Sequence, residues 1–312
     1  MNQIYRKSPF WSLAGPLLGY LAIQFAVQFA AQFVIEMPYV MRAYAEVLRG
    51  SSDAVPSMQE LLNSYMQALE PAFEAIARYQ VEIMMLSALG TIVLTGILFA
   101  RDRKLEQKAG VVLPERASLS KYWTVVILGI SGCIAATCLM AMVQLAFYDE
   151  QYQQAAQITY SAGFLVQIIG LGIVIPIAEE LMFRGILYKR FRERQGFWYS
   201  ALWSALLFSF IHSNTTQMIY AFLLGVLLSY LYEKFGSFRA PVVLHILLNT
   251  GSVVFTELGV FRWIAGSPVR MAGAVIAGAF LCSVMFVVIQ RMPVRIETHQ
   301  NTDDTDRNDM FS

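Results

Sequence analysis

The stretch that decides the fold is SAGFLVQIIGLGIVIPIAEELMFRGIL, residues 161–187. It is apolar over most of its length and exceeds the roughly 20 residues that a helix needs to cross a bilayer. It nevertheless contains Glu179, Glu180 and Arg184. Ionisable side chains inside a membrane span are expensive, so each needs a partner or a function. The segment therefore predicts a transmembrane helix that carries a functional site.

The composition of the whole chain is that of a membrane protein. Of its 312 residues, 57% are hydrophobic and 14% are charged, whereas soluble domains average roughly 25% charged residues. The formal net charge of +1 gives no reason to expect a nucleic-acid partner. No Walker motif and no GxSxG is present, so a nucleotide partner and serine hydrolysis lack support. The three cysteines lie in apolar runs and are expected to be small hydrophobic residues.

About eight apolar stretches are long enough to be transmembrane helices. They lie near 10–35, 79–100, 122–148, 161–187, 197–213, 216–232, 241–257 and 268–290. With the N-terminus inside, most of the 23 basic residues fall in cytoplasmic segments, as the positive-inside rule requires. We therefore predict an all-α, polytopic membrane helical bundle in a cell membrane, with both termini cytoplasmic. In a bacterium this would be the inner membrane.

The chain divides into three predicted regions. Residues 1–120 form an N-terminal membrane region with two spans, 121–292 form the core, and 293–312 form a polar, disordered cytoplasmic tail. Within the first region, 36–78 is a long outer loop. Its Ser57-x-x-Glu60 spacing is typical of a capping box, followed by apolar residues at helical spacing. An amphipathic helix on the outer surface is expected there.

Three polar clusters stand out inside the core spans. Besides Glu179, Glu180 and Arg184, they contain His212 in one stretch and His245 with Asn249 in another. Glu180 and Arg184 are four residues apart and can pair on one helix face, while Glu179 points about 100° away. Such groups can simply join helices through hydrogen bonds. Three such clusters within one region of the chain favour a functional site over hydrogen bonding between helices alone.

A hairpin calculation brings two clusters together. With a cytoplasmic turn near Gln195–Gly196, Glu179 and His212 both lie roughly 25 Å from the turn at 1.5 Å per residue. A carboxylate facing an imidazole can activate water. The fifth stretch would then end inside the bilayer, where polar residues 213–216 line a wet cavity. The basic residues 189–194 suggest that substrate reaches this site from the cytoplasmic side.

At this point the sequence resembles the CPBP family, which includes type II CAAX prenyl endopeptidases and bacteriocin-processing, Abi-like proteins. The motifs that carry the resemblance are Glu179-Glu180-x-x-x-Arg184, Phe208-x-x-x-His212 and His245-x-x-x-Asn249, in the family's order. They cover residues 160–257, about a third of the chain.

The resemblance implies an intramembrane endopeptidase that cleaves membrane-associated peptides or proteins, in CAAX-type or bacteriocin and leader-type processing. It implies that Glu179 activates a water with His212, and that His245 and Asn249 stabilise the oxyanion. Glu180 and Arg184 would hold the catalytic helix, and Phe208 would orient His212.

Whether a cofactor takes part stays open at this point. Glu179, His212 and His245 could ligate zinc, but the HExxH spacing of common zinc peptidases is absent. Alternative functions are a non-catalytic membrane scaffold or regulator with the same fold, and a proton-coupled transporter.

Two further patterns lie outside the motifs. Gln24, Gln28 and Gln32 share one face of the first span, either as hydrogen-bonding residues between helices or as the lining of a cavity. Gly273-x-x-x-Ala277 in the last span suggests close helix packing.

Overall fold

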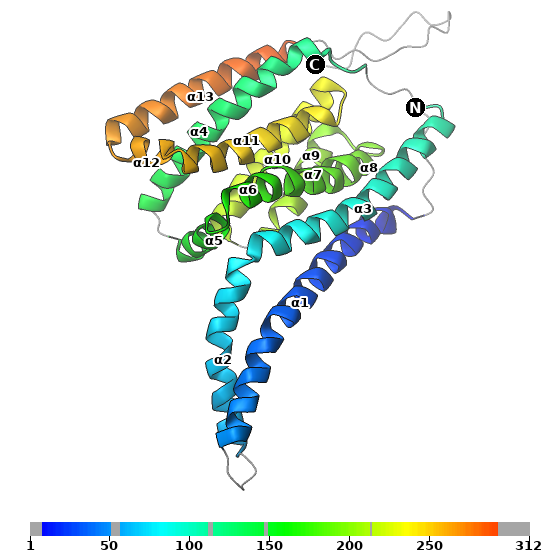
Figure 1. The fold of residues 1–312 in the computed structure, drawn as a ribbon. Helices are drawn as coiled ribbons and strands as arrows, with labels where there is room; N and C mark the ends of the chain where they lie inside the picture. Colours follow the sequence, from blue (N-terminus) through cyan, green and yellow to red (C-terminus); the bar gives the residue numbers. More distant parts are fainter. Residues whose placement is uncertain (1–7, 51–56, 112–114, 147–148, 213, 293–312) are drawn as a thin grey trace, which may run out of the picture.

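The computed structural model describes residues 8–50, 57–111, 115–146, 149–212 and 214–292, and every regular element in these ranges is helical (Figure 1). The long elements are α1 (Pro9–Gly50), α2 (Met58–Arg78), α3 (Gln80–Lys108), α4 (Trp123–Ala146), α10 (Thr215–Phe235), α11 (Arg239–Glu257) and α13 (Pro268–Gln290). The shorter ones are η1 (Leu119–Tyr122), α5 (Glu150–Tyr160), α6 (Phe164–Gln167), η2 (Ile168–Val174), α7 (Ile175–Glu180), η3 (Leu181–Tyr188), α8 (Lys189–Arg192), α9 (Phe197–Ser209) and α12 (Val260–Ala265).

Seven helical segments among the described residues are long and apolar enough to cross a membrane. One of them is the continuous rod formed by α6, η2, α7, η3 and α8, which spans Phe164–Arg192. The prediction of an all-α polytopic membrane bundle is therefore confirmed. The chain is a multi-pass membrane protein.

The eighth predicted span, 197–213, is wrong as a membrane crossing. Helix α9 has only 13 residues, about 20 Å at 1.5 Å per residue, against a hydrocarbon core of about 30 Å. It stops because the polar side chain of Asn214 caps the next helix, accepting a hydrogen bond from the Gln217 N–H at 2.9 Å. The predicted cavity lining at 213–216 is wrong for Asn214, Thr215 and Thr216, which do not line the cavity described below, and Ser213 lies outside the described residues.

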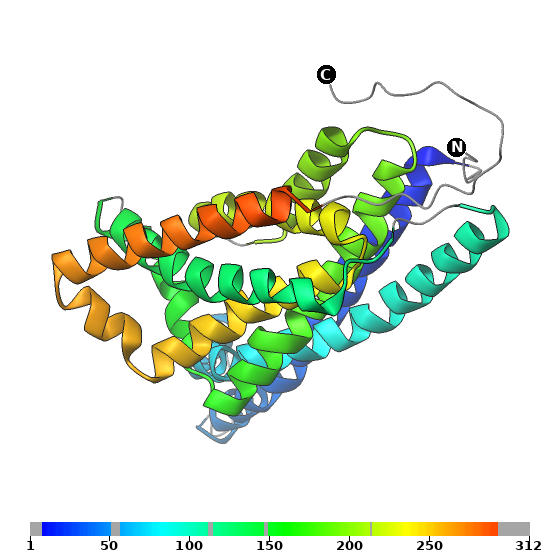
Figure 2. The same cartoon turned by 90° about the horizontal axis from the view of Figure 1, so that it is seen from above.

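Polar contacts join many helix ends at one end of the bundle, here called the basic end. There α3, α8, α10 and α13 finish, and α4, α9 and α11 begin (Figures 1 and 2). Lys234 of α10 donates to the Gln290 carbonyl of α13 at 2.8 Å, and Arg192 of α8 pairs with Glu233 of α10 at 2.6 Å. The opposite end, here called the far end, is where α3 and α6 begin and where α4 and α11 finish.

Close backbone approaches set the helix packing. A Cβ atom on Gly278 of α13 would lie 2.8 Å from the Ala135 Cβ of α4 and 3.0 Å from the Ser131 carbonyl oxygen. The predicted packing motif at Gly273 and Ala277 is wrong, because both residues are exposed and a Cβ on Gly273 would meet nothing within 4 Å. The small residue that permits the close contact is Gly278, which follows Ala277 and points about 100° away from it.

The predicted outer loop 36–78 is instead part of a helical hairpin. Helix α1 continues to Gly50, and α2 packs back along it, so that the two project away from the bundle (Figure 1). The Tyr65 hydroxyl donates to Glu36 at 3.3 Å across this hairpin. The capping box is confirmed, since the Ser57 hydroxyl accepts from the Glu60 N–H and the Glu60 carboxylate accepts from the Ser57 N–H. The predicted tail, 293–312, lies outside the described residues.

Candidate active site

Two π-helical turns flank the short helix that carries the paired glutamates. Helix α7 lies between η2 and η3 and packs against α3 and α11. A π turn disturbs the regular hydrogen-bond ladder and releases carbonyl groups for other donors. The Asn249 amide donates to the Leu171 carbonyl at 3.1 Å, and the Thr250 hydroxyl donates to the Gly172 carbonyl at 3.2 Å. The polar face of α11 is thereby fixed to the rod that holds Glu179.

Glu180 is the centre of a buried polar network. Its Oε1 atom lies 3.0 Å from Arg184 Nη1 and 3.0 Å from His245 Nδ1, and both Glu180 and Arg184 are fully buried. The i, i+4 pair predicted from the spacing is present. Because the carboxylate also engages His245, it fixes the orientation of that ring. The sequence did not suggest this contact, since 65 residues separate the partners.

Glu179 occupies the other side of the same imidazole. Its Oε2 atom lies 3.6 Å from His245 Nε2, and its side chain keeps 14% of its surface exposed. His245 thus lies between two carboxylates, one buried and one open to a cavity. Of the two predicted site histidines, His212 and His245, it is His245 that directly contacts Glu179.

His212 reaches the site from the end of α9. Its Nδ1 atom lies 3.0 Å from the Phe208 carbonyl oxygen. A carbonyl only accepts, so this contact assigns the ring hydrogen to Nδ1 and leaves Nε2 as the acceptor in the neutral imidazole. The early end of α9 is what allows the ring to face the cavity.

Phe208 connects the three motifs. Its ring centroid lies 5.0 Å from that of His212 and 5.9 Å from that of His245, both edge-to-face. The Arg184 guanidinium carbon lies 4.5 Å from the same centroid, a cation–π distance. The ring therefore supplies an apolar wall that holds both imidazoles and covers a guanidinium whose Nε and Nη2 lack hydrogen-bond partners.

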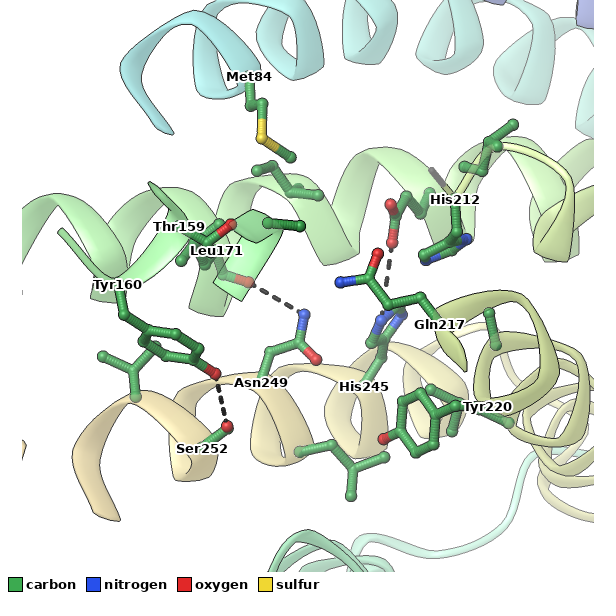
Figure 3. A pocket seen from close by; sticks show the side chains of 18 of the residues that line it. Met84, Thr159, Tyr160, Leu171, His212, Gln217, Tyr220, His245, Asn249 and Ser252 are labelled. Carbon is green, nitrogen blue, oxygen red and sulfur yellow. Dashed lines mark hydrogen bonds and ion pairs between the residues drawn. The ribbon is translucent and has the colours of Figure 1, made fainter. Parts of the chain in front are cut away.

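A cavity of about 800 Å³ opens beside these groups (Figure 3). The predicted site residues that line it are Glu179, Phe208, His212, His245 and Asn249. Glu180 and Arg184 do not line it, in keeping with full burial. The structure thus separates the seven predicted residues into five at the cavity and two behind it.

Helix α1 contributes residues that the motifs did not reveal. Tyr20 is buried, lines the cavity and hydrogen-bonds with Gln24. Gln24 and Gln28 also line the cavity, which supports the cavity-lining interpretation of the glutamine face, whereas Gln32 is exposed elsewhere. Tyr20 lies one helical turn before Gln24 on this face, and that spacing was the signal that could have identified it.

The donor set does not fit a preformed metal site. Among the described residues, no three His, Cys, Asp or Glu side chains are grouped closely enough to hold a metal ion. Glu180 and the Phe208 carbonyl group engage the Nδ1 atoms of His245 and His212, an arrangement that leaves Nε2 as the nitrogen of each ring that could face a metal. The misfit therefore lies in the grouping of the side chains and not in these contacts. The proposal below therefore uses no step through a metal.

The fold and the cavity define a membrane-embedded helical protein with a carboxylate–imidazole site. Residues 161–251 match the family described as "Type II CAAX prenyl endopeptidase Rce1-like". The resemblance found in the motifs is thereby confirmed, and this segment of the chain is similar to the Rce1-like family.

Three bacterial relatives match parts of the chain. "Putative membrane peptidase YdiL" of Bacillus subtilis (strain 168) is 27% identical over 37% of this chain and 47% of its own length. An "Uncharacterized 24.3 kDa protein" of Escherichia coli is 32% identical over 29% of this chain and 44% of its own. "UPF0177 protein YaiF" of Lactococcus lactis is 32% identical over 28% and 40%. The matches span less than half of each relative. No solved structure matches the chain.

Proposed function

We propose that this protein is an intramembrane peptidase that hydrolyses a peptide bond of a membrane-associated peptide or protein. The observation that carries the proposal is the placement of Glu179 beside His245, His212 and Asn249 around one cavity. The Rce1-like match and the name of the Bacillus subtilis relative support the same class of reaction. Because these three relatives are bacterial, leader-type peptide maturation is the finer assignment that we propose.

In this mechanism Glu179 accepts a proton from water, with the Nε2 lone pair of His212 orienting the same molecule. The hydroxide attacks the scissile carbonyl carbon. His245 donates from Nε2 to the oxyanion. Both of its ring nitrogens face carboxylates, which only accept, so in this mechanism each nitrogen carries a hydrogen. The second N–H of Asn249 is a further donor, since one serves Leu171. Collapse of the intermediate breaks the C–N bond as Glu179 returns its proton to the leaving amine.

The test is cleavage of a membrane peptide by the purified full chain in liposomes. Changing Glu179→Gln, His212→Ala or His245→Ala should each lower kcat by about two to four orders of magnitude, the range for general-base and oxyanion groups. Glu257→Gln is the matched control, because that exposed carboxylate lies at the end of the helix that carries His245. Unchanged turnover in the Glu179→Gln variant would overturn the proposal.

The alternatives predict different results. A scaffold would show no cleavage by the unmodified chain, and a proton-coupled transporter would show solute flux that depends on Glu179 without hydrolysis. The contact between Glu179 and His245 beside the amide donor of Asn249 favours peptide-bond hydrolysis over both alternatives.

A further inference from the structure

The cavity extends from the catalytic groups mainly in one direction, although Tyr20 and Leu224 also line it beside the start of η3. On the rod it is lined by Leu171, Ile175 and Ala178, which all precede Glu179. On α11 its lining continues beyond His245 to Thr256, toward the end of that helix. Helix α3 contributes only its first turns, and α4 contributes residues from Cys133, near its middle, to Met140. All of these segments lie toward the far end of the bundle.

The route to the basic end is filled. Met182, Phe183, Ile186 and Leu187 of η3 have no exposed surface. Beyond them, Arg190 pairs with Asp102 at 2.7 Å, where both side chains are almost completely buried. Lys189 contacts Glu106, and Arg192 contacts Glu233, so ion pairs join α8 to α3 and to α10. An opening here would break a buried ion pair, which is strongly unfavourable.

These contacts favour a direction of access other than the one expected from the sequence. The basic residues after the catalytic helix were expected to leave the site open to the cytoplasm. Instead, three of them are bound to acidic residues, and they close that end. The acidic partners are distant in sequence, so the spacing of the basic residues did not reveal them.

Helix α5 lies over the far end of the cavity. Asp149, which caps α5, accepts from the Thr216 hydroxyl at 2.7 Å, and Tyr160 at the other end of α5 lies 2.9 Å from the Ser252 hydroxyl (Figure 3). Ala155 and Thr159 between these attachments face the cavity. The helix thus bridges α10 and α11 across the side on which the cavity extends.

The lining is mostly apolar, with polar groups among the apolar side chains, and the described part of it contains no Lys or Arg. Its amide groups come from Gln24, Gln28, Gln80, Gln217 and Asn249, and several tyrosine, serine and threonine residues add hydroxyl groups. A substrate carboxylate would meet Glu179 and the two imidazoles, and the one imidazolium that the mechanism uses, His245, already faces two carboxylates. A buried charge without a partner is unfavourable. Amides and hydroxyls instead suit the N–H and C=O groups of an extended, uncharged segment.

We propose that the substrate is an uncharged internal segment of a peptide, and that it reaches Glu179 from the outer face of the membrane, beneath α5. The inference rests on the proposed function for the reaction. The positive-inside rule places the basic end in the cytoplasm, and the far end therefore opens outward. A substrate presented by its free C-terminal carboxylate does not fit this lining.

Thiol labelling tests the direction of access without any need for cleavage. In a background with Cys133, Cys138 and Cys282 changed to Ala, single cysteines replace Ala136 or Ala155 at the cavity, or Gln107 at the basic end. A membrane-impermeant maleimide is then applied to intact cells and to inverted vesicles. Ala136→Cys and Ala155→Cys should react in intact cells, and Gln107→Cys only in inverted vesicles. Labelling of the cavity cysteines only from the side of Gln107, or from neither side, would overturn the proposal, as would Gln107→Cys reacting from outside.

Peptide charge tests the substrate class. Two peptides share one scissile sequence. One peptide is extended on both sides of the scissile bond, and the other ends in a free carboxylate two residues after that bond. The extended peptide should show a kcat/KM higher by about tenfold or more, because the carboxylate finds no unpaired cation. Equal or reversed values would overturn the substrate class. If neither peptide is cleaved while labelling occurs from outside, the proposed hydrolysis fails and the direction of access stands.

Discussion

At the residue scale, the distinctive feature is one imidazole held by two carboxylates with different surroundings. Glu180 is sealed off with Arg184, while Glu179 faces the cavity. The buried carboxylate can orient His245 without meeting substrate, and the open one can meet water. Adjacent positions on a helix point about 100° apart, which lets two neighbouring glutamates occupy such different environments.

Glu180→Gln tests this division. The neutral amide cannot balance Arg184, and it weakens the hold on His245 Nδ1. We expect kcat to fall by about a hundredfold or more with little change in KM, as for other carboxylates that orient a catalytic imidazole. Leaving a buried Arg unpaired should also lower the free energy of unfolding by about 3–5 kcal/mol. Steady-state kinetics and thermal unfolding in detergent provide the two readings. A large rise in KM with unchanged kcat would instead place Glu180 in substrate binding.

At the element scale, the close contact between α9 and α10 holds Arg184 against the site. A Cβ on Gly225 would lie 2.8 Å from the Ala205 Cβ and 3.0 Å from Arg184 Nη2. These distances are shorter than packed atoms tolerate, so a methyl group must push the helices apart or displace the guanidinium.

Gly225→Ala should therefore lower the free energy of unfolding by about 1–3 kcal/mol, the range for overpacked cores, and should reduce turnover through Arg184 and Glu180. Gly96→Ala is the matched control, since a Cβ at that helical glycine would meet nothing within 4 Å. Thermal unfolding of both variants checks the prediction. Equal melting temperatures would show that the two helices have room to separate.

Helix α5 depends on an ionised cap. The hydrogen bonds from the Thr216 hydroxyl and the Tyr152 N–H hold the pKa of Asp149 below its ordinary value. The depressed pKa means that Asp149 stabilises the folded state fully above the ordinary carboxyl pKa of about 3.9. This contribution is lost as the pH falls through the lower folded pKa.

We expect amide hydrogen exchange in α5 to accelerate over that acidic range, after correction for intrinsic rates. Asp149→Asn should give the faster exchange already at neutral pH, because the charge is removed. The part of α10 that follows Thr216 is the internal reference, because Asp149 is bonded to α10 through Thr216. Protection of α5 that does not change in the variant would rule out the cap as its anchor.

At the scale of the whole molecule, the α1–α2 hairpin extends the protein well beyond the bundle. Helix α1 has 42 residues, about 63 Å at 1.5 Å per residue, roughly twice the hydrocarbon thickness. Met58, Leu62, Met66 and Phe73 form an exposed apolar face along α2. Polar side chains instead line the cleft between α1 and α2.

We predict that this apolar face rests in the membrane interface. A spin label at Met66→Cys should be more accessible to oxygen, which partitions into lipid, than to a water-soluble nickel complex. A label at Gln67→Cys, on the cleft side, should show the opposite preference. Equal accessibility at the two neighbouring positions would indicate that the hairpin stands free in water.

The sequence by itself determined the class of protein, because apolar stretches of membrane length with few charges have no stable alternative to transmembrane helices. Local rules also determined the Ser57–Glu60 cap and the Glu180–Arg184 pair, since both depend on spacing within one helix. The three motifs could be assigned to one region for the same reason. The roles of their residues stay predictions.

Only the tertiary structure decided which groups meet across helices. The contact of Glu180 with His245, the position of Phe208 between two imidazoles, and the pairing of Arg190 with Asp102 join residues far apart in the chain. Helical periodicity defines the face of a side chain but not the neighbour that the face receives. The end at which the cavity opens depends on how all the helices pack together. Local spacing suggested access from the basic end, whereas the packing supports our proposal of access from the far end.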